Sequence, residues 1–202
     1  RLITGAEQDA VIRELLTGQA EDGHGSWPAE MRPALEYVGF ARQLRDFLLR
    51  SIERGLGPGD LERLGAEHGR PMWSAAGEFL REYERVQLLS RAHSYSAAEL
   101  VTAVLQRPQL LREHPFHTII VDDAQLLDPT AGELIRELAP HAQLVVVGGD
   151  ADQSVFAFRG ASSRFLREFP AEHEIELTEP HRTPLPACIS IVDSEGRLRD
   201  VV

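Results

Sequence analysis

The chain has 202 residues, of which 43% are hydrophobic and 26% charged, a balance that indicates a folded core and excludes wholesale disorder. All 21 basic residues are arginines, so chemistry that needs a lysine, such as a Schiff base or a GxxxxGK[ST] phosphate-binding loop, is excluded within these residues. The 32 acidic residues give a net charge of −11, unusual for a free-standing nucleic-acid binder, and no apolar run approaches the roughly 20 residues that span a membrane.

Helical patterns fill the first ninety residues. Thr4 and Glu7 have the spacing of a capping box, and the apolar stripe behind them predicts a helix that Gly18 ends. Apolar residues at helical spacing predict a second helix, while a capping aspartate and a first-turn proline begin two more. These three helices are expected over 40–52, 60–64 and 71–86.

The pattern changes in the second half of the chain. Ser96 and Glu99 form another capping box, and short apolar runs then alternate with helical segments. Strands that alternate with helices imply an α/β fold with a parallel sheet, which binds ligands at the carboxyl ends of its strands. Strands are expected over 117–123, 143–150 and 174–178, helices over 129–139 and 163–169, and a hairpin could form from 188–192 and 198–202.

Acidic turns follow the first two predicted strands, both of which are expected to be buried. Asp122 and Asp123 end the first one, with Gln125 two positions later. Nucleoside-triphosphate hydrolases use such paired carboxylates to hold Mg²⁺ and to activate a water, although two aspartates are also common in ordinary turns. Gly149 and Asp150 end the second strand, where a glycine lets the backbone approach a phosphate.

The segment after this second turn combines an amide, two aromatic rings and a cation. The carboxamide of Gln153 can reach a terminal phosphate or its water. Phe156 and Phe158 alternate beside Arg159, a pattern that suits bases stacking on the rings while the cation meets the phosphodiester. The same spacing fits two core phenylalanines that flank a buried arginine, and the residues alone leave both interpretations open.

Three segments, in this order and at these separations, resemble the motifs of superfamily 1 DNA helicases of the UvrD/Rep type. VDDAQ (121–125) resembles motif II, VVVGGDADQSVFAFRGA (145–161) motif III, and LTEPHRT (177–183) motif IV. The long match to motif III is the specific one. Residues 1–16 and 93–100 resemble other segments of the family more weakly. Within the family, the sequence is most similar to the helicase–nuclease subunits of actinobacteria.

The resemblance implies a site for ATP and Mg²⁺. It makes Asp122 the metal ligand, Asp123 the general base and Gln153 the sensor of the γ-phosphate. Arg182 would reach the same phosphate from motif IV, and His181 would stack on the adenine in place of the family's tyrosine. Three further residues would line the nucleotide: Gln125, Gly149 and Asp150.

The resemblance also implies a DNA site. Phe158 and Arg159 would contact single-stranded DNA, Phe158 by stacking, whereas Phe156 stands where the family has tyrosine and is expected to pack beneath the loop. The expected partners are single-stranded DNA and junctions with duplex DNA, the remainder of a longer helicase chain, and a heterodimeric subunit. We expect a protein of the cytoplasm, associated with the nucleoid, and the single Cys188 suits that reducing compartment.

The implied architecture is that of an internal helicase fragment. Residues 1–92 would form the all-helical insertion called 1B, and residues 93–184 the C-terminal part of the RecA-like domain 1A, a P-loop NTPase fold without its P-loop. Residues 185–202 stay unassigned. The P-loop would precede Arg1 and the second RecA-like domain would follow Val202, so we expect the fragment alone to be inactive while its parent couples ATP hydrolysis to 3′→5′ movement in DNA repair or recombination.

Two features support an alternative function. Asp123 replaces the family's glutamate and shortens the side chain by about 1.5 Å, which would slow hydrolysis. With the acidic net charge, this favours a catalytically impaired subunit that acts as a DNA-binding scaffold.

Four arginines interleaved with acids on the second predicted helix form either a salt-bridged surface, the favoured interpretation, or a DNA track: Arg42, Arg45, Arg50 and Arg54.

Overall fold

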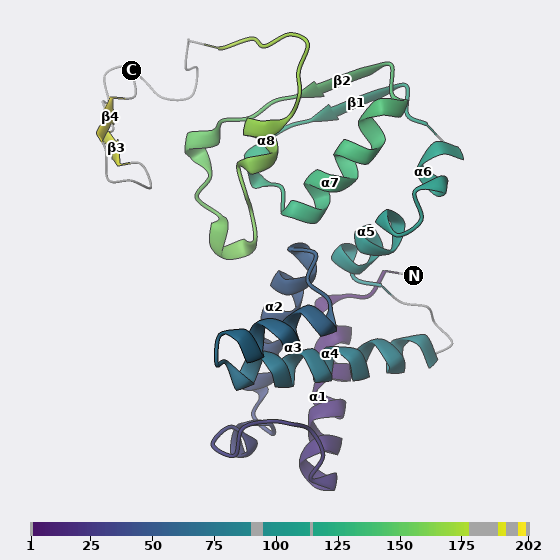
Figure 1. Ribbon diagram of the computed structural model, residues 1–202, viewed down its shortest axis with the longest axis vertical. Coiled ribbons are helices and arrows are strands. Elements are labelled where there is room, and N and C mark those ends of the chain that lie inside the picture. The colour runs from purple at the N-terminus through teal and green to yellow at the C-terminus, as the bar shows by residue number, and fades with distance from the viewer. Residues whose placement is uncertain (1, 90–94, 114, 178–189, 193–197, 201–202) are drawn as a thin grey trace.

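The computed structural model describes residues 2–89, 95–113 and 115–177, together with the backbone of 190–192 and 198–200. It is a mixed helix-and-sheet structure (Figure 1). We call residues 2–89 the helical unit and residues 95–177 the α/β unit. The helical unit contains α1 (Gly5–Asp22), α2 (Val38–Glu53), α3 (Pro58–Glu67) and α4 (Pro71–Leu89). The α/β unit contains α5 (Ala97–Leu105), α6 (Gln109–Glu113), β1 (Thr118–Val121), α7 (Pro129–Leu138), β2 (Leu144–Val147) and α8 (Arg164–Glu168).

The first helix begins as the sequence predicts and ends later. The capping box of Thr4 and Glu7 is confirmed, because each side chain accepts a hydrogen bond from the backbone N–H of the other residue. The prediction that Gly18 ends the helix is wrong: α1 continues to Asp22, and Gly23 takes the left-handed conformation at φ 66°. Packing of Gln19 and Ala20, directly after this glycine, against the rest of the unit outweighs the low helix propensity of one interior glycine.

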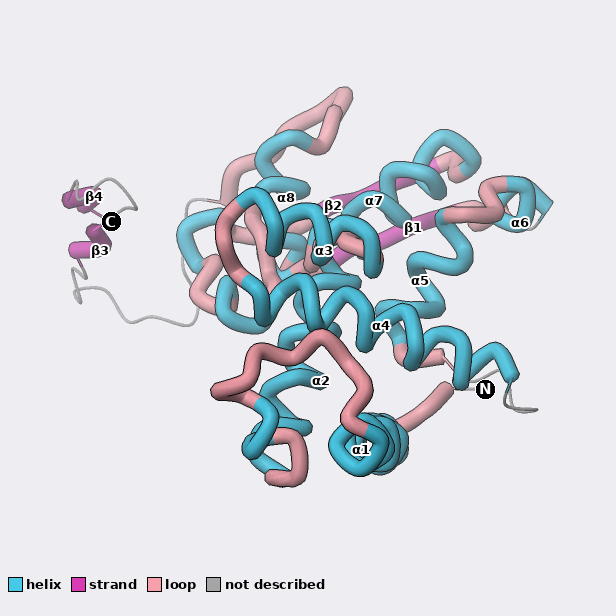
Figure 2. Tube along the Cα trace, turned by 60° about the horizontal axis from the view of Figure 1, so that its bottom comes forward, coloured by secondary structure: helices cyan, strands magenta, loops and turns pink. Residues whose placement is uncertain are grey.

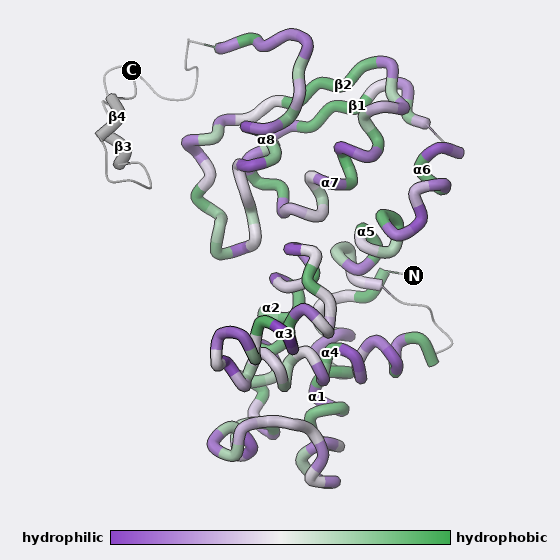
Figure 3. Tube along the Cα trace, in the orientation of Figure 1, coloured by the Kyte–Doolittle hydropathy of each residue, from purple (hydrophilic) through white to green (hydrophobic). Residues whose placement is uncertain are grey.

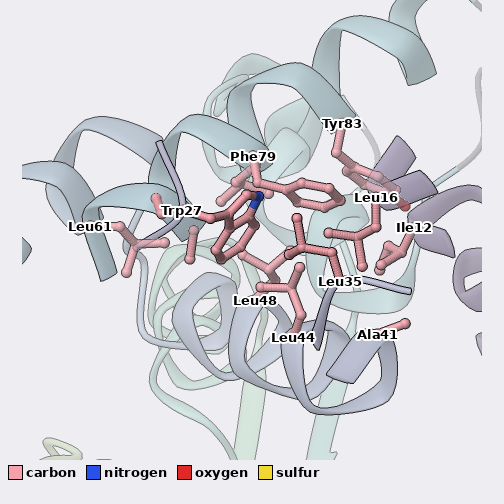
Figure 4. Close-up of a cluster of buried hydrophobic side chains, with 13 residues drawn as sticks. Ile12, Leu16, Trp27, Leu35, Ala41, Leu44, Leu48, Leu61, Phe79 and Tyr83 are labelled. Carbon is pink, nitrogen blue, oxygen red and sulfur yellow. The ribbon is translucent and has the colours of Figure 1, made fainter. Parts of the chain in front are cut away.

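The core of the helical unit is a single cluster of apolar side chains from α1, α2, α3, α4 and the loop before α2 (Figure 4). Phe79 on α4 lies at its centre, only 1% exposed, with its ring centroid 6.0 Å from that of Trp27. The indole Nε1–H of Trp27 donates to Oε1 of the buried Gln19 at 2.7 Å, so this polar atom is satisfied inside the cluster.

Two glycines let α3 and α4 approach each other closely. A Cβ atom at Gly77 would lie 2.6 Å from the carbonyl oxygen of Pro58, and one at Gly65 would lie 2.6 Å from the backbone nitrogen of Ser74. Both distances are below any normal contact, so the helix pair depends on the absence of side chains at these positions.

The sheet of the α/β unit is parallel, as predicted. β1 pairs with β2 in the register Thr118–Leu144 to Val121–Val147. Ile119 and Val121 point into a second apolar cluster, which α7 and α8 help to form, and Figure 2 shows α7 running along the two strands. The opposite face is open: Ile120 is 73% exposed. The expectation of two fully buried strands is therefore wrong for this face, although the apolar composition along both strands is evident in Figure 3.

The third predicted strand is absent from the described residues that cover it. Residues 174–177 form no strand, and their two apolar side chains, Ile175 and Leu177, are 84% and 90% exposed. An alternating pattern needs a neighbouring strand to complete its hydrogen bonds, and the segment has none here. Farther along, β3 (Ser190–Val192) and β4 (Leu198–Asp200) pair antiparallel. Within the described part of the chain, no helix has the length and apolar character of a membrane span.

Candidate functional site

The carboxyl ends of β1 and β2 form one continuous edge. Beyond the last strand pair, the Gly148 N–H donates to the carbonyl of Val121 at 2.8 Å. The Ala124 N–H donates in turn to the carbonyl of Gly148 at 2.9 Å. These bonds carry the pairing past both strands, so the turn that follows β1 and the turn that follows β2 lie against each other, as a parallel sheet predicts.

Gln125 joins these two turns. Its buried side chain accepts a hydrogen bond at Oε1 from the Asp150 N–H (3.1 Å) and donates from Nε2 to the Asp123 carboxylate (3.3 Å). A Cβ atom on residue 149 would lie 2.5 Å from the same Oε1, which explains the need for Gly149. The sequence predicts Gln125, Gly149 and Asp150 as nucleotide-binding residues. The structure brings them together and shows that Gln125 holds the edge in shape, while their contact with a nucleotide stays a prediction.

The two aspartates after β1 differ in their surroundings. Asp123 takes a left-handed conformation at φ 51°, which aspartate tolerates better than most residues. Its N–H donates to Oδ1 of Asp122 at 2.9 Å. Both residues are exposed at the edge of the sheet, and the carboxylate of Asp123 also accepts the hydrogen bond from Gln125. The roles of the two aspartates, Asp122 as metal ligand and Asp123 as general base, stay predictions.

The donor set suits a magnesium ion that is shared with a nucleotide. In the described residues, no group of three or more histidine, cysteine, aspartate or glutamate side chains is arranged to hold a metal. Mg²⁺ in nucleotide sites is held by only one or two carboxylates, together with phosphate oxygens and water. Asp122, exposed at the strand end, fits the role of such a ligand.

Gln153 lies on the same edge, one short turn after β2. Its Nε2 donates to Oδ2 of Asp150 at 2.8 Å, and the other oxygen of Asp150 accepts from the Asp152 N–H at 2.9 Å. Asp150 thus organises its own turn while Gln153 remains exposed. A carboxamide nitrogen carries two N–H donors, so the Gln153 side chain can keep this hydrogen bond and donate the other to a phosphate.

The segment that follows, residues 155–161, is called the aromatic loop here. Phe158 is 73% exposed and Phe156 is 37% exposed, so Phe158 is not a core residue. The guanidinium carbon of Arg159 lies 5.5 Å from both ring centroids, within the range of a cation–π contact, and the two rings are 6.0 Å apart. The open choice between core packing and an exposed aromatic surface is settled for Phe158 in favour of exposure.

The remaining two predicted site residues, His181 and Arg182, lie outside the described residues. Their approach to the edge that carries Asp122 and Gln153 stays a prediction. Of the arginines on α2, Arg45 pairs with Asp9 and Asp46, each at 2.8 Å, as a salt-bridged surface predicts.

Gln125→Leu is expected to lower the free energy of unfolding by about 1–3 kcal/mol, because leucine has a similar volume but leaves the Asp150 N–H without its partner. Denaturant unfolding measures this change. Gln143→Leu, at an exposed site before β2, is the matched control and should change stability by less than about 0.5 kcal/mol. Equal stabilities of the two variants would contradict the bridging role of Gln125.

Comparison with known proteins gives this edge a family context. The model of the UvrD/REP helicase N-terminal domain matches residues 3–174. The chain is 28% identical to DNA helicase II of Escherichia coli over 98% of its own length and 27% of that protein's. It is 35% identical to the ATP-dependent DNA helicase UvrD1 of Mycobacterium tuberculosis over 59% of its length and 18% of that protein's.

A third relative is the putative ATP-dependent DNA helicase YjcD of Bacillus subtilis, 29% identical over 59% of this chain and 17% of that protein. The chain therefore spans about a quarter or less of the length of these relatives. The family match covers most of the chain, including β1 and β2, the turns that Gln125 joins, and the aromatic loop. The chain belongs to the UvrD/REP helicase N-terminal domain family.

Proposed function

We propose that the protein is an ATP-dependent DNA helicase or translocase that moves along single-stranded DNA with 3′→5′ polarity. Two of its relatives are named DNA helicase II and ATP-dependent DNA helicase UvrD1, and these names support this function. The observation that carries the proposal is the direct passage from the edge with Asp122 and Gln153 into the exposed aromatic loop. Gln153, a group suited to a nucleotide, and Phe158 and Arg159, groups suited to a nucleic acid, thus lie on one continuous segment.

At the nucleotide, Asp122 would hold Mg²⁺, which neutralises charge on the phosphate oxygens when it is bound. Asp123 would orient the attacking water, and Gln153 and Arg182 would contact the γ-phosphate. The 202 residues contain no lysine, so we propose that hydrolysis requires a phosphate-binding loop that these residues do not supply. His181 would stack on the adenine.

At the DNA, the ring of Phe158 would stack on a base and Arg159 would meet the backbone phosphate. Phe156, whose ring lies beside that of Phe158, would hold Arg159 in place through its own cation–π contact. The proposed substrates are single strands and their junctions with duplex DNA, in repair or recombination.

A hydrogen bond from a side chain to the backbone connects the two sites. The hydroxyl of Ser154, directly before the aromatic loop, donates to the carbonyl of Gln125 at 3.3 Å. Gln125 also contacts Asp123 and Asp150 through its side chain. A rearrangement of the sheet edge that carries Asp122 and Gln153 would therefore displace the start of the aromatic loop. This supports a mechanism in which ATP hydrolysis moves single-stranded DNA past Phe158.

A second candidate function is a DNA-binding scaffold that no longer turns over ATP. The short Asp123 side chain, already engaged by the Gln125 amide, favours it. The discriminating experiment measures ATP hydrolysis by the full-length protein with and without single-stranded DNA. Stimulation by DNA supports the motor, and hydrolysis no faster than that of the Asp122→Ala variant supports the scaffold.

Phe158→Ala is expected to weaken the binding of single-stranded DNA by about 5- to 150-fold, because the stacking of one base contributes about 1–3 kcal/mol. Fluorescence anisotropy of a labelled oligothymidylate, titrated with the full-length protein, measures the affinity. Tyr37→Ala removes another exposed ring, on the helical unit, and should leave the affinity unchanged. Equal affinities of Phe158→Ala and wild type would count against the DNA site.

A further inference from the structure

The end of the aromatic loop rests on the helical unit. Gly160 is buried, has φ 90°, and lies against the last turn of α2. A Cβ atom at this position would lie 2.5 Å from Oε2 of Glu53 and 2.8 Å from Nη1 of Arg50. The left-handed backbone and the lack of space both require glycine here.

The surface beneath Gly160 is an ion pair. Nη1 of Arg50 and Oε2 of Glu53 lie 2.6 Å apart, and both side chains are largely buried. Burial raises the pKa of the Glu53 carboxyl, and the charge of Asp128 adds to that effect, while Arg50 and Arg54 lower it. Loss of Arg50 would therefore leave a buried carboxylate without its main compensating charge.

The other attachments of the aromatic loop come from the α/β unit. Ser154 donates to the carbonyl of Gln125 before the loop, and the Ser162 N–H donates to the carbonyl of Leu127 after it, at 2.8 Å. Both ends are thus tied to one short segment, residues 125–127. The contact of Gly160 with α2 is a third attachment and comes from a different unit.

We propose that Arg50 and Glu53 are positioning residues for DNA binding: their ion pair supports Gly160 and thereby fixes the orientation of Phe158 and Arg159. The proposal rests on the proposed DNA role of the aromatic loop. It gives the helical unit an influence on DNA affinity that needs no contact of its own with the strand. A shift of α2 relative to the α/β unit would change how Phe158 is presented.

The first test asks whether Gly160 and Glu53 affect DNA binding through their contact with each other. Gly160→Ala places a methyl group against the pair and is expected to weaken binding of labelled oligothymidylate by the full-length protein about 10-fold. Glu53→Ala, which removes the carboxylate, should weaken it about 3-fold. In the double variant the methyl group meets no carboxylate, so the affinity should be no lower than that of Gly160→Ala alone.

The second test separates positioning from stability. Arg50→Lys keeps the charge and should retain affinity, whereas Arg50→Met should lose about 3-fold at temperatures where both variants remain folded by circular dichroism. Glu67→Ala removes one of the two acidic partners of the exposed Arg63 on α3 and serves as the control. It should bind as wild type does.

The outcomes distinguish this proposal from the proposed function. If Phe158→Ala weakens binding while Gly160→Ala and Arg50→Met bind as wild type, the positioning role is wrong and the DNA site stands. If the effects of Gly160→Ala and Glu53→Ala multiply in the double variant, the two residues act independently and the positioning role is again wrong. If Phe158→Ala binds normally, the DNA site itself is wrong.

Discussion

Asp122→Ala is expected to slow DNA-stimulated ATP hydrolysis by the full-length protein about 10²- to 10³-fold, because an ion that neutralises phosphate charge contributes several kcal/mol to the transition state. Asp122 is an exposed carboxylate at the end of β1, and the hydrogen bond that it accepts from the Asp123 N–H is local. The variant should therefore fold normally, and the loss should appear in the rate rather than in the thermal midpoint.

A matched control is available on the same edge. Asp152→Ala removes another exposed carboxylate, in the turn after β2, and should keep the rate within about threefold of wild type, as surface substitutions outside a site do. Steady-state phosphate release at saturating single-stranded DNA measures both variants. A wild-type rate in Asp122→Ala would overturn the assignment of this aspartate, whereas equal losses in both variants would indicate a general effect of charge.

Phe79→Ala is expected to lower the free energy of unfolding of the helical unit by about 3–5 kcal/mol, the usual cost of replacing a fully buried aromatic residue. Phe79 lies at the centre of the cluster in Figure 4 and packs against Trp27. Urea denaturation followed by tryptophan fluorescence is the appropriate measurement, because both tryptophans, Trp27 and Trp73, belong to the helical unit.

The control for this variant is Tyr37→Ala, which deletes an exposed ring of the same unit. Its free energy of unfolding should stay within about 0.5 kcal/mol of that of wild type. A loss below about 1 kcal/mol for Phe79→Ala would mean that the cluster relaxes to fill the cavity, contrary to the close packing described above.

Local signals in the sequence predicted the starts of several elements correctly. The capping boxes at Thr4 and Ser96 were predicted from residues three positions apart, and the structure forms both. The parallel pairing of β1 with β2 followed from the alternation of strands and helices. Such features depend on neighbours in sequence, or on the order of elements, and are therefore accessible without a structure.

Features that depend on distant partners could not be predicted. The alternation at 174–178 resembles that of a strand, but a strand needs a second chain segment beside it, and residues 174–177 have none in the described structure. Gln125 was predicted as a nucleotide ligand from its place in a motif, whereas its hydrogen bond to Asp150 spans 25 positions. Gly160 and Glu53 are in contact although they lie more than a hundred positions apart in the sequence, and no local sequence pattern predicts this contact.

The two apolar clusters have a mechanical consequence. One is built from residues 11–83 and the other from residues 119–169, and in the described part of the chain they share no member. A rotation of one unit against the other would leave each cluster intact and would strain the junction where α2 meets α5, α7 and Gly160. We therefore expect each half to move as a rigid body, so that a small change at one end of the molecule is converted into displacement at the other.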